Sequence, residues 1–327
     1  MKKILVTGCA GFIGYHLCIR LIEESKYEVV GIDNINDYYD VQLKKNRLKN
    51  LKKYKTKFNF KKIDLINEKE LIRIFSKNKF DYVVNLAAQA GVRYSIENPK
   101  TYLMSNVLGF FNILDVSQKY KIKHLIFAST SSVYGSSKTF PLKESYNTDN
   151  PLSFYAATKK SNEVMAYSYS NIFKLPCTGL RFFTVYGPYG RPDMSLFKFT
   201  NSLTRNEPIE LYNKGDHIRD FTYIDDVVDG IYSLIKKPSK AKIPYNIFNI
   251  GSDNPKHLKK FLRIIENNLD KKAKIIKKSL QTGDVYKTHA SIRKLKLFAG
   301  YSPKISLNKG IKEFILWYKS YIQKNDF

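Results

Sequence analysis

Two residues, Tyr155 and Lys159, have the types and the spacing of an acid–base pair. They are four residues apart, so on a helix they lie on the same face. An ammonium group next to a phenol favours the phenolate, which lowers the tyrosine pKa toward neutrality. A phenolate at neutral pH can take a proton from an alcohol or a sugar hydroxyl. The same spacing also occurs on ordinary solvated helix faces, so the interpretation depends on the elements that hold the pair.

The start of the chain has the pattern of a dinucleotide-binding turn. Residues 3–7 form a short apolar run that is typical of a buried parallel strand. Gly8, Gly11 and Gly14 follow with the spacing Gly-x-x-Gly-x-x-Gly. Residues 15–24 then have the amphipathic pattern of a helix. Glycines let the backbone approach a pyrophosphate, and the helix N-terminus offers free N–H groups to the phosphates. The alternative is an ordinary strand–turn–helix of an α/β protein.

Further predicted strands end in residues that suit a bound dinucleotide. Residues 28–32 end at Asp33, 25 residues beyond the first glycine, which is near the spacing expected for a ribose-binding carboxylate. A carboxylate there repels a 2′-phosphate, so we expect NAD and not NADP. Residues 59–65, 82–88 and 124–130 end in a carboxylate, small residues and hydroxyls, respectively. Because ligands of open α/β sheets bind at the carboxyl ends of the strands, these ends should line one crevice.

Length, charge and cysteine content narrow the class of protein. A chain of 327 residues can bury a large core and suits one nucleotide-binding domain with a smaller second lobe. The net charge of +27 raises nucleic-acid binding as a rival, but the lysines are spread along the chain and are not interleaved with stacking aromatics. Cys9, Cys18 and Cys177 are odd in number and lack metal-ligand spacing, so we expect small buried thiols in a cytoplasmic protein. The sequence predicts neither a signal peptide nor a membrane span.

The predicted fold class is α/β, a doubly wound (Rossmann) parallel sheet with a smaller C-terminal α/β substrate-binding lobe. Gly187 and Pro188 mark the start of the second lobe, whereas residues 245–251 have the pattern of one more strand of the first. The two domains should therefore alternate along the chain. We expect residues 37–54, which are polar and rich in lysine, and the last few residues to be flexible. The predicted boundaries are residues 1–186 and 223–252 for an NAD-binding Rossmann domain, and residues 187–222 and 253–327 for a nucleotide-sugar-binding lobe.

Together these motifs resemble the extended short-chain dehydrogenase/reductase superfamily over nearly the whole chain. The glycine turn, residues 85–88, residues 130–135 and the Tyr155/Lys159 pair follow one another in the order of that superfamily. Within it, the chain resembles UDP-glucuronate 4-epimerases in particular. The stretches that carry this second resemblance are residues 89–95, 150–160, 180–188, 190–194 and 219–226.

The resemblance implies an NAD-dependent inversion at C4 of a UDP-sugar, most directly UDP-glucuronate to UDP-galacturonate. Tyr155 would take the proton of the sugar 4-hydroxyl while C4 gives hydride to NAD. Lys159 would keep the phenol acidic and bind the nicotinamide ribose, and Thr130 would hydrogen-bond the reacting oxygen. The transient 4-keto sugar would turn over in the site and receive the hydride on its opposite face, so that NAD stays bound.

The resemblance also assigns the remaining site residues. No metal is among the implied ligands. The implied cofactor contacts are Gly8, Gly11, Phe12, Ile13, Gly14, Asp33, Asn34, Asp64, Leu65, Leu86, Ala87, Ala88, Gln89, Asn106, Tyr155 and Lys159. The implied substrate contacts are Arg93, Ser95, Thr130, Ser131, Thr184, Arg191, Arg219 and Asp284.

Two of these arginines have plausible structural roles instead. Arg191, with Thr184 beside it, is the first candidate for binding the sugar carboxylate, but it could simply brace Asp193 within a loop. Arg219 is expected at the pyrophosphate, and its alternative is an ion pair with Asp220 or Asp225. By the same analogy Asp284 would bind the uridine ribose.

The residues after Thr130 separate neighbouring chemistries. Nucleotide-sugar 4,6-dehydratases place Asp-Glu after the threonine, and UDP-glucuronate decarboxylases usually place Ser-Glu there. This chain has Ser131 and Ser132, so dehydration lacks an obvious acid and epimerisation is the simplest outcome. The alternatives that stay open are a 4-epimerase of UDP-glucose or UDP-N-acetylhexosamine, a UDP-glucuronate decarboxylase, an NAD-binding regulator and a nucleic-acid binder.

The chain departs from the family pattern in its second half. Tyr189 replaces a frequent tryptophan, His217 stands where small or polar residues are usual, and residues 288–291 read Thr-His-Ala-Ser where relatives commonly have Thr-Tyr-Ala-Asp. These departures concern the substrate and not the cofactor. A metal role for His217 and His289 is not expected, because lone histidines are more often surface or hydrogen-bonded residues.

Two helical patterns, residues 104–120 and 155–173, have apolar faces. In relatives, two such helices from each subunit form a four-helix interface, so the resemblance implies a homodimer. The alternative is burial of these faces inside the monomer. We expect neither nucleic acid nor a membrane as a partner.

Overall fold

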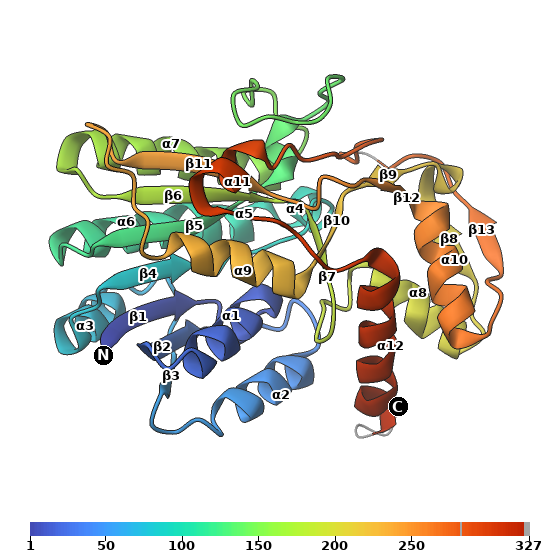
Figure 1. The fold of residues 1–327 in the computed structure, drawn as a ribbon, viewed down its shortest axis with the longest axis horizontal. Coiled ribbons are helices and arrows are strands. Elements are labelled where there is room, and N and C mark those ends of the chain that lie inside the picture. The colour runs from blue at the N-terminus through green and yellow to red at the C-terminus, as the bar shows by residue number, and fades with distance from the viewer. Residues whose placement is uncertain (282, 324–327) are drawn as a thin grey trace.

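A parallel sheet forms the centre of the molecule. The computed structural model describes residues 1–281 and 283–323, and within them this sheet has seven strands in the order β11-β6-β5-β4-β1-β2-β3 (Figure 1). After β3 the chain crosses back to β4, beside β1, so the order reverses between β1 and β4; in such sheets this switch point opens the ligand crevice. The strands are β1 (Lys2–Thr7), β2 (Tyr27–Asp33), β3 (Phe58–Lys62), β4 (Tyr82–Asn85), β5 (His124–Thr130), β6 (Cys177–Phe182) and β11 (Tyr245–Ile250).

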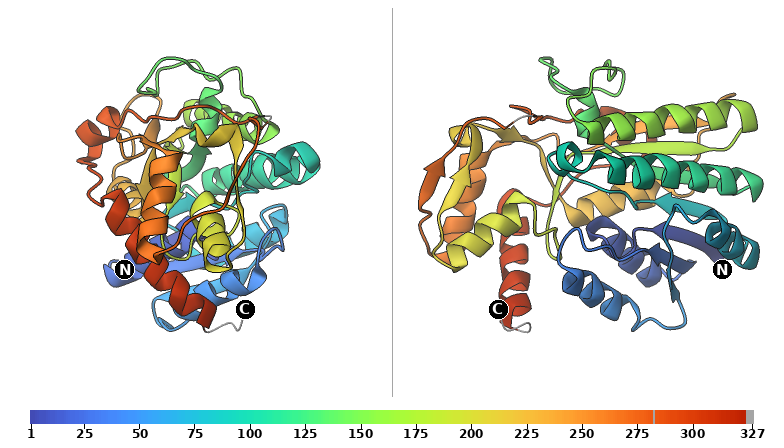
Figure 2. Two further views of the ribbon diagram at one scale, coloured as in Figure 1. Left: turned by 90° about the vertical axis from the view of Figure 1, so that its right-hand side faces the viewer. Right: turned by 180° about the vertical axis from the view of Figure 1, so that it is seen from behind.

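Helices cover both faces of the sheet, as the predicted fold class requires. One face is covered by α1 and α9, which pack side by side, and the other by α3, α6 and α7 (Figures 1 and 2). Both faces of the central strands are therefore buried, which explains their continuous apolar runs, whereas the edge strand β3 is largely exposed. The helices of this part are α1 (Phe12–Glu23), α2 (Val41–Leu51), α3 (Glu68–Asn78), α4 (Tyr94–Glu97), α5 (Pro99–Tyr102), the π-helix η1 (Leu103–Leu108), α6 (Gly109–Lys119), the 3₁₀ turn η2 (Ser131–Tyr134), α7 (Phe154–Phe173), α9 (Ile224–Leu234) and α11 (Arg293–Ala299).

A second, smaller α/β lobe lies beyond the carboxyl ends of the strands (Figure 1). Its short strands pair as β12 with β9 and β13 with β8, and β7 pairs with β10 where the lobes join. Its elements are β7 (Thr184–Tyr186), α8 (Ser195–Thr204), β8 (Ile209–Leu211), η3 (Tyr212–Gly215), β9 (Ile218–Arg219), β10 (Phe221–Tyr223), β12 (Lys256–His257), α10 (Leu258–Leu269), β13 (Ile275–Lys277) and α12 (Leu307–Gln323).

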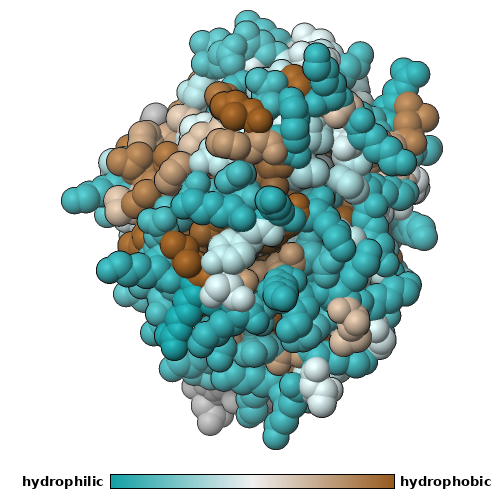
Figure 3. All heavy atoms as spheres, turned by 90° about the vertical axis from the view of Figure 1, so that its left-hand side faces the viewer, coloured by the Kyte–Doolittle hydropathy of each residue, from teal (hydrophilic) through white to brown (hydrophobic). Residues whose placement is uncertain are grey.

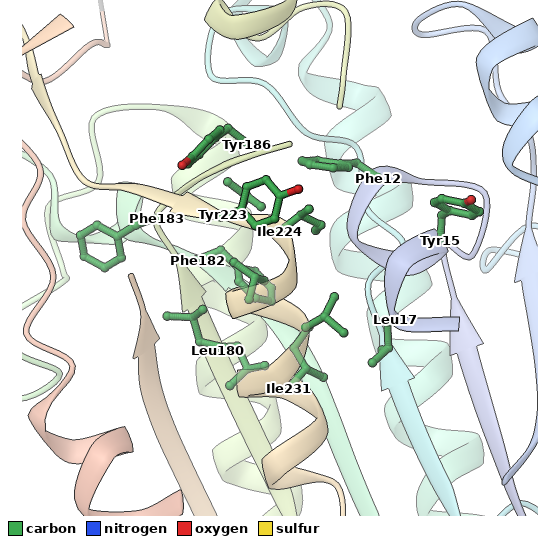
Figure 4. Packing of buried hydrophobic residues seen from close by; sticks show 14 of the residues in the cluster. Phe12, Tyr15, Leu17, Leu180, Phe182, Phe183, Tyr186, Tyr223, Ile224 and Ile231 are labelled. Carbon is green, nitrogen blue, oxygen red and sulfur yellow. The ribbon is translucent and has the colours of Figure 1, made fainter. Parts of the chain in front are cut away.

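The hydrophobic core continues from the sheet into the second lobe. Phe12, at the start of α1, belongs to the same buried cluster as Tyr186 and Tyr223 (Figure 4). Phe221 and Phe261 stack at 4.1 Å between ring centres in the same cluster. The two lobes are therefore packed on one another through aromatic side chains near the N-terminus of α1.

The predicted strands are confirmed, with small shifts at their ends. The strand predicted at residues 59–65 ends at Lys62, so Asp64 and Leu65 lie in the loop that follows it. Residues 245–251 do return to the main sheet, where β11 pairs with β6. The domain boundaries stay a prediction.

The prediction that residues 37–54 are flexible is wrong. They contain α2, whose N-terminus is capped by the Asp40 carboxylate, which accepts the N–H of Gln42 at 2.7 Å. The Arg47 side chain is fully buried and donates to the carbonyl oxygens of Ala10 and Tyr189 at 2.8 and 2.6 Å. These contacts hold the polar segment against the glycine turn, and local sequence does not reveal them. The predicted flexibility of the last few residues concerns positions 324–327, which lie outside the described residues.

Candidate functional site

The turn between β1 and α1 is as tight as the three glycines predict. A Cβ atom at Gly14 would lie 2.1 Å from the carbonyl oxygen of Gly8, and one at Gly8 would lie 2.8 Å from the Ala87 nitrogen. Gly8 also has a φ of +69°, a left-handed conformation that favours glycine. The N-cap of α1 is Gly11, and within the described chain no side chain caps this terminus and no acidic residue lies in its first turn. Its N–H groups are thus available to an anion.

Asp33 lies at the carboxyl end of β2, beside the glycine turn. Its Oδ2 accepts the N–H of Ala10 at 3.1 Å, and its Oδ1 accepts the N–H of Ile35 at 2.8 Å. A carboxylate has about four acceptor positions, so both oxygens can still accept hydroxyl groups. Burial raises the pKa of Asp33, while these N–H donors and the Lys44 ammonium act in the opposite direction. The location and acceptor capacity of Asp33 fit the two hydroxyls of a ribose.

Other predicted cofactor contacts are joined to one another at the ends of the strands. The Asn34 amide donates to Asp64 Oδ2 at 2.9 Å, beyond β2 and β3. Asn106, in the π-helix η1, accepts the N–H of Gln89 at 2.8 Å and donates to the Gln89 carbonyl at 3.0 Å. The Gln89 side-chain nitrogen is buried and has no hydrogen-bond partner among the described residues. A buried unpaired donor is costly, so this atom is suited to a ligand.

The carboxyl end of the sheet therefore fits a dinucleotide. It combines an uncapped helix N-terminus, a backbone turn with no room for side chains and a ribose-type carboxylate. The remaining predicted cofactor residues lie at the same carboxyl end of the sheet. Phe12 and Ile13 begin α1, Leu65 follows β3, and Leu86, Ala87 and Ala88 follow β4.

Replacement of Gly14 by alanine should abolish dinucleotide binding. The added methyl group would meet backbone at 2.1 Å, so the turn must open, and we expect a loss of about 1–3 kcal/mol in the free energy of unfolding. The measurement is the dinucleotide content of the purified protein, together with thermal unfolding. Gly300→Ala is the control for lost stability alone, because an alanine at its φ of +76° strains the backbone although the added Cβ meets nothing within 4 Å; it should unfold more easily and keep its dinucleotide. Normal dinucleotide content in Gly14→Ala would contradict this assignment.

The predicted acid–base residues meet at the carboxyl end of β5. Tyr155 and Lys159 lie on α7, whose N-terminus is capped by Ser153 through a 3.1 Å bond from the Ala156 N–H. Thr130 ends β5, and its hydroxyl donates to Ser132 Oγ at 3.2 Å. The Lys159 side chain is almost completely buried, and this burial lowers its pKa to about 8. The Thr130 hydroxyl thus acts on the Tyr155 phenol, and Lys159 follows one turn later on the same helix.

The prediction that Lys159 lowers the tyrosine pKa toward neutrality is wrong for the protein residues alone. Burial raises the pKa of Tyr155, and the groups that oppose this rise are the Thr130 hydroxyl and the Arg191 guanidinium. Desolvation of the phenolate outweighs both. Proton transfer by Tyr155 near pH 7 therefore needs additional positive charge next to the phenol.

Arg191 lies close enough to Tyr155 for its charge to act on the phenol. It lines a small, mainly apolar cavity together with Thr184 and Phe12, where the start of α1 meets the second lobe. Its guanidinium forms a two-bonded ion pair with Asp193, through Nε at 3.0 Å and through Nη2. The Tyr38 hydroxyl donates to the same carboxylate at 3.3 Å. The alternative role, bracing Asp193, is thus present, and it uses two of the five N–H donors of Arg191.

The predicted pyrophosphate and uridine residues pair with each other. Arg219 Nη2 donates to Asp284 Oδ1 at 2.8 Å, while Arg93 and His217 approach Asp284 Oδ2 at 4.0 and 3.5 Å. Burial, followed by the charge of Arg219, lowers the pKa of His217. The alternative prediction, an ion pair of Arg219 with Asp220 or Asp225, is wrong. Asp220 instead accepts the backbone N–H groups of residues 252, 253 and 290. The Asp225 carboxylate makes no ion pair with Arg219 among the described contacts.

Two predicted substrate hydroxyls have different surroundings. The Ser95 hydroxyl is buried and donates to the Val92 carbonyl at 2.6 Å, so its proton is engaged within its own loop. Ser131 begins the η2 turn directly after Thr130 and is partly exposed. The geometry therefore favours Ser131 over Ser95 as a contact of the sugar.

The residues that depart from the family pattern have structural partners. Tyr189 packs against Tyr15 and Trp317, each at 4.9 Å between ring centres. His289 Nε2 contacts Asp253 at 2.8 Å. Among residues 1–281 and 283–323 there is no group of three or more His, Cys, Asp or Glu residues that could hold a metal ion. The three cysteines are free and buried, as predicted.

Comparison with known proteins places this site in a family. The family model described as "NAD dependent epimerase/dehydratase family" matches residues 4–251. This chain belongs to that family. Three similar proteins cover nearly its whole length. They are "Protein CapI" of Staphylococcus aureus (48% identical; 98% of this chain, 100% of the relative), "UDP-glucuronate 4-epimerase" of Thermodesulfobacterium geofontis (42%; 99% and 98%), and the crystal structure of UDP-glucuronic acid 4-epimerase from Bacillus cereus in complex with UDP-glucuronic acid and NAD (33%; 98% and 99%; TM-score 0.91).

The family membership confirms the predicted superfamily, the Rossmann-like fold and the NAD dependence. The expected alternative contact of Arg191 with Asp193 is present. Sequence reasoning missed Tyr38, which reaches Asp193 from a distant segment. Tyr38 lies 155 residues from Asp193, so no local pattern connects them.

Proposed function

We propose that the protein interconverts UDP-glucuronate and UDP-galacturonate by NAD-dependent epimerisation at C4. The observation that carries this proposal is the arrangement around the Tyr155 phenol. The Thr130 hydroxyl and the Arg191 guanidinium both act on this phenol, and Arg191 lines a small cavity with Phe12, the first residue of the helix that follows the glycine turn. Relatives named UDP-glucuronate 4-epimerase support the same substrate.

The chain's own residues divide the work at C4. Tyr155 accepts the proton of the sugar 4-hydroxyl and later returns it, and Thr130 orients the reacting oxygen. NAD supplies a reversible hydride acceptor and a positive ring that would oppose the effect of burial on the phenol. Lys159 contributes an ammonium on the same helix face as Tyr155. There is no net oxidation, so the same dinucleotide serves every turnover.

Control of the sugar carboxylate is the second task of the site. Oxidation at C4 makes the glucuronate a β-keto acid, which loses CO₂ readily. Arg191 would hold the carboxylate charged by ion pairing, with hydroxyl donors from Thr184 and Ser131. Asp193 keeps the guanidinium in place, so bracing and substrate binding are compatible roles for Arg191.

The second lobe would hold the UDP group. Arg219 would bind the pyrophosphate and Asp284 the uridine ribose, and both lie at the inner side of that lobe. Arg93 is near enough to Asp284 to add a second positive charge there.

The rival activities have less support from the site. A decarboxylase or dehydratase of this superfamily usually has a carboxylate after the threonine, where this chain has Ser131 and Ser132. A non-catalytic NAD-binding regulator or a nucleic-acid binder would not need Tyr155, Lys159 and Thr130 together. An epimerase of neutral UDP-hexoses is the nearest rival, and Arg191 is the feature that argues against it.

Product identification tests the proposed function. The purified protein is incubated with UDP-glucuronate without added cofactor, and the products are identified by NMR. We expect UDP-galacturonate with no CO₂ release, and much slower conversion of UDP-glucose and UDP-N-acetylglucosamine. A UDP-pentose with CO₂ would show a decarboxylase, and preference for a neutral sugar would show the rival epimerase.

We further propose that the protein is a homodimer. Exposed apolar side chains lie on η1, α6 and α7, namely Leu103, Leu108, Phe111, Val164, Tyr167, Ile172 and Phe173. Figure 3 shows hydrophobic side chains gathered among polar ones at the end of the molecule where α7 ends. Sedimentation as a monomer would contradict the proposal.

The cellular location stays a prediction. Among the described residues no helix is long and apolar enough to span a membrane. Free, buried thiols at Cys9, Cys18 and Cys177 support a reducing compartment, and we propose the cytoplasm.

A further inference from the structure

A buried carboxylate next to the catalytic centre ties three elements of the sheet domain together. Glu163, on α7, accepts two hydrogen bonds from Arg181 on β6, from Nε at 2.9 Å and from Nη2 at 2.8 Å. The side chains of both residues are only 5% exposed. Ser129, on β5, donates to Glu163 Oε1 at 2.6 Å. The carboxylate is thus clamped by donors from two neighbouring strands.

This clamp, formed by Glu163, Arg181 and Ser129, lies next to the residues proposed to act in catalysis. Tyr155, Lys159 and Glu163 are spaced four residues apart on α7, so they lie on one face within about 12 Å along the helix axis. Ser129 directly precedes Thr130 in β5. The clamp therefore joins the helix that carries the phenol and the ammonium to the strand that carries the threonine hydroxyl.

The charge of Glu163 also acts on Lys159. Burial disfavours the Lys159 ammonium, and Glu163 is the group that opposes this effect on its pKa. Around the clamp, the Arg181 guanidinium lies 4.8 Å from the Tyr134 ring centre, and the Tyr245 hydroxyl donates to the Glu163 carbonyl at 3.0 Å. The Glu144 carboxylate and the Lys294 ammonium lie on the far side of Arg181, whereas Glu163 is the carboxylate that acts on Lys159.

We propose that Glu163 is a positioning residue for the epimerisation. It favours the charged form of Lys159 and keeps the Tyr155 hydroxyl in a fixed position relative to the Thr130 hydroxyl. This rests on the proposed function. A purely structural ion pair would stabilise the fold without influencing the titration of Lys159. Glu163 instead places its negative charge one helical turn beyond the ammonium, and Arg181 and Ser129 fix its orientation.

Glu163→Gln is the direct test, with the pH dependence of kcat as its first measurement. Lys159 is charged below its pKa of about 8, so wild-type kcat should fall as the pH rises through that value. Without the negative neighbour the ammonium is less favoured, so in Glu163→Gln this fall should move to lower pH by ~1 unit. We also expect kcat at pH 7 to fall ~10-fold, because Tyr155 would be held less firmly in position next to Thr130.

A second measurement follows Lys159 without turnover. The chemical shift of its side chain, read by NMR of protein labelled with ¹³C at the lysine Cε across a pH series, reports the unprotonated fraction. Its midpoint should also move to lower pH in Glu163→Gln. If the proposed function is wrong, the wild type shows no epimerisation, yet this midpoint shift still tests the role of Glu163.

Two further variants separate position from stability. Ser170→Ala removes another buried hydrogen bond of α7, from Ser170 to the Leu175 carbonyl, far from Lys159. It should lower the melting temperature and leave both pH profiles unchanged. If Glu163→Gln does not fold, the double variant Glu163→Leu/Arg181→Met removes both buried charges and should show the same shift. Wild-type pH profiles in a folded Glu163 variant would overturn the proposal.

Discussion

Replacement of Tyr155 by phenylalanine is expected to lower kcat for C4 epimerisation by about 10³-fold, because a positioned acid–base group contributes typically 10²–10⁴-fold. The variant keeps the ring that packs 6.0 Å from Tyr102 and loses the hydroxyl alone. The fold and the affinity for the UDP-sugar should therefore change little. The measurements are kcat with UDP-glucuronate and the dissociation constant of UDP-glucuronate by calorimetry.

Tyr169→Phe is the matched control for this variant. Tyr169 lies on the same helix, 14 residues and about 21 Å further along its axis, and it receives the same chemical change. It should retain wild-type kcat. Undiminished turnover in Tyr155→Phe would show that another group moves the proton, and a parallel loss in Tyr169→Phe would show that the effect arises from α7 as a whole.

Replacement of Arg191 by glutamine is expected to change the substrate preference. A charge-assisted hydrogen bond contributes roughly 1.5–3 kcal/mol, so kcat/KM for UDP-glucuronate should fall by about 10- to 100-fold. The value for UDP-glucose, which lacks the carboxylate, should fall much less. Release of CO₂ from UDP-glucuronate should rise relative to epimerisation, because the keto acid is held less firmly. Rates with both sugars and CO₂ yield are measured in parallel.

The ion pair of Arg191 with Asp193 requires its own control. Glutamine at position 191 leaves the Asp193 carboxylate partly buried without its cation, and Arg191 is what lowers the pKa of that carboxyl against the effect of burial. The double variant Arg191→Gln/Asp193→Asn removes both charges. It should show the same loss of preference for UDP-glucuronate. Equal losses with UDP-glucose and UDP-glucuronate in both variants would leave Arg191 only the bracing role.

The features that local sequence could predict are those that depend on interactions between residues close together in the sequence. Gly11 and Gly14 are required by backbone contacts with Gly8, within seven residues, and the apolar runs of β1 and β5 are dictated by burial on both faces. The Tyr155/Lys159 pair follows from helix periodicity. These patterns, with the resemblance they carry, were sufficient for the fold class and the cofactor.

The features that could not be predicted depend on contacts between distant segments. Arg47 fixes α2 through the carbonyl of Tyr189, 142 residues away, so a lysine-rich stretch that looks flexible is in fact ordered. The pKa of Tyr155 depends on how completely the phenol is desolvated, which spacing alone does not reveal. Arg219 pairs with Asp284, 65 residues away, and not with its sequence neighbours.

The most direct test of the account is the fate of the hydrogen on C4. UDP-glucuronate that carries deuterium at C4 is incubated with the protein in ordinary water, and the product is examined by NMR and mass spectrometry. The UDP-galacturonate should retain the deuterium at C4, because the hydrogen that leaves C4 returns to the same carbon while sugar and cofactor stay bound. Product with ordinary hydrogen at C4, or a product that has lost its carboxylate, would contradict it.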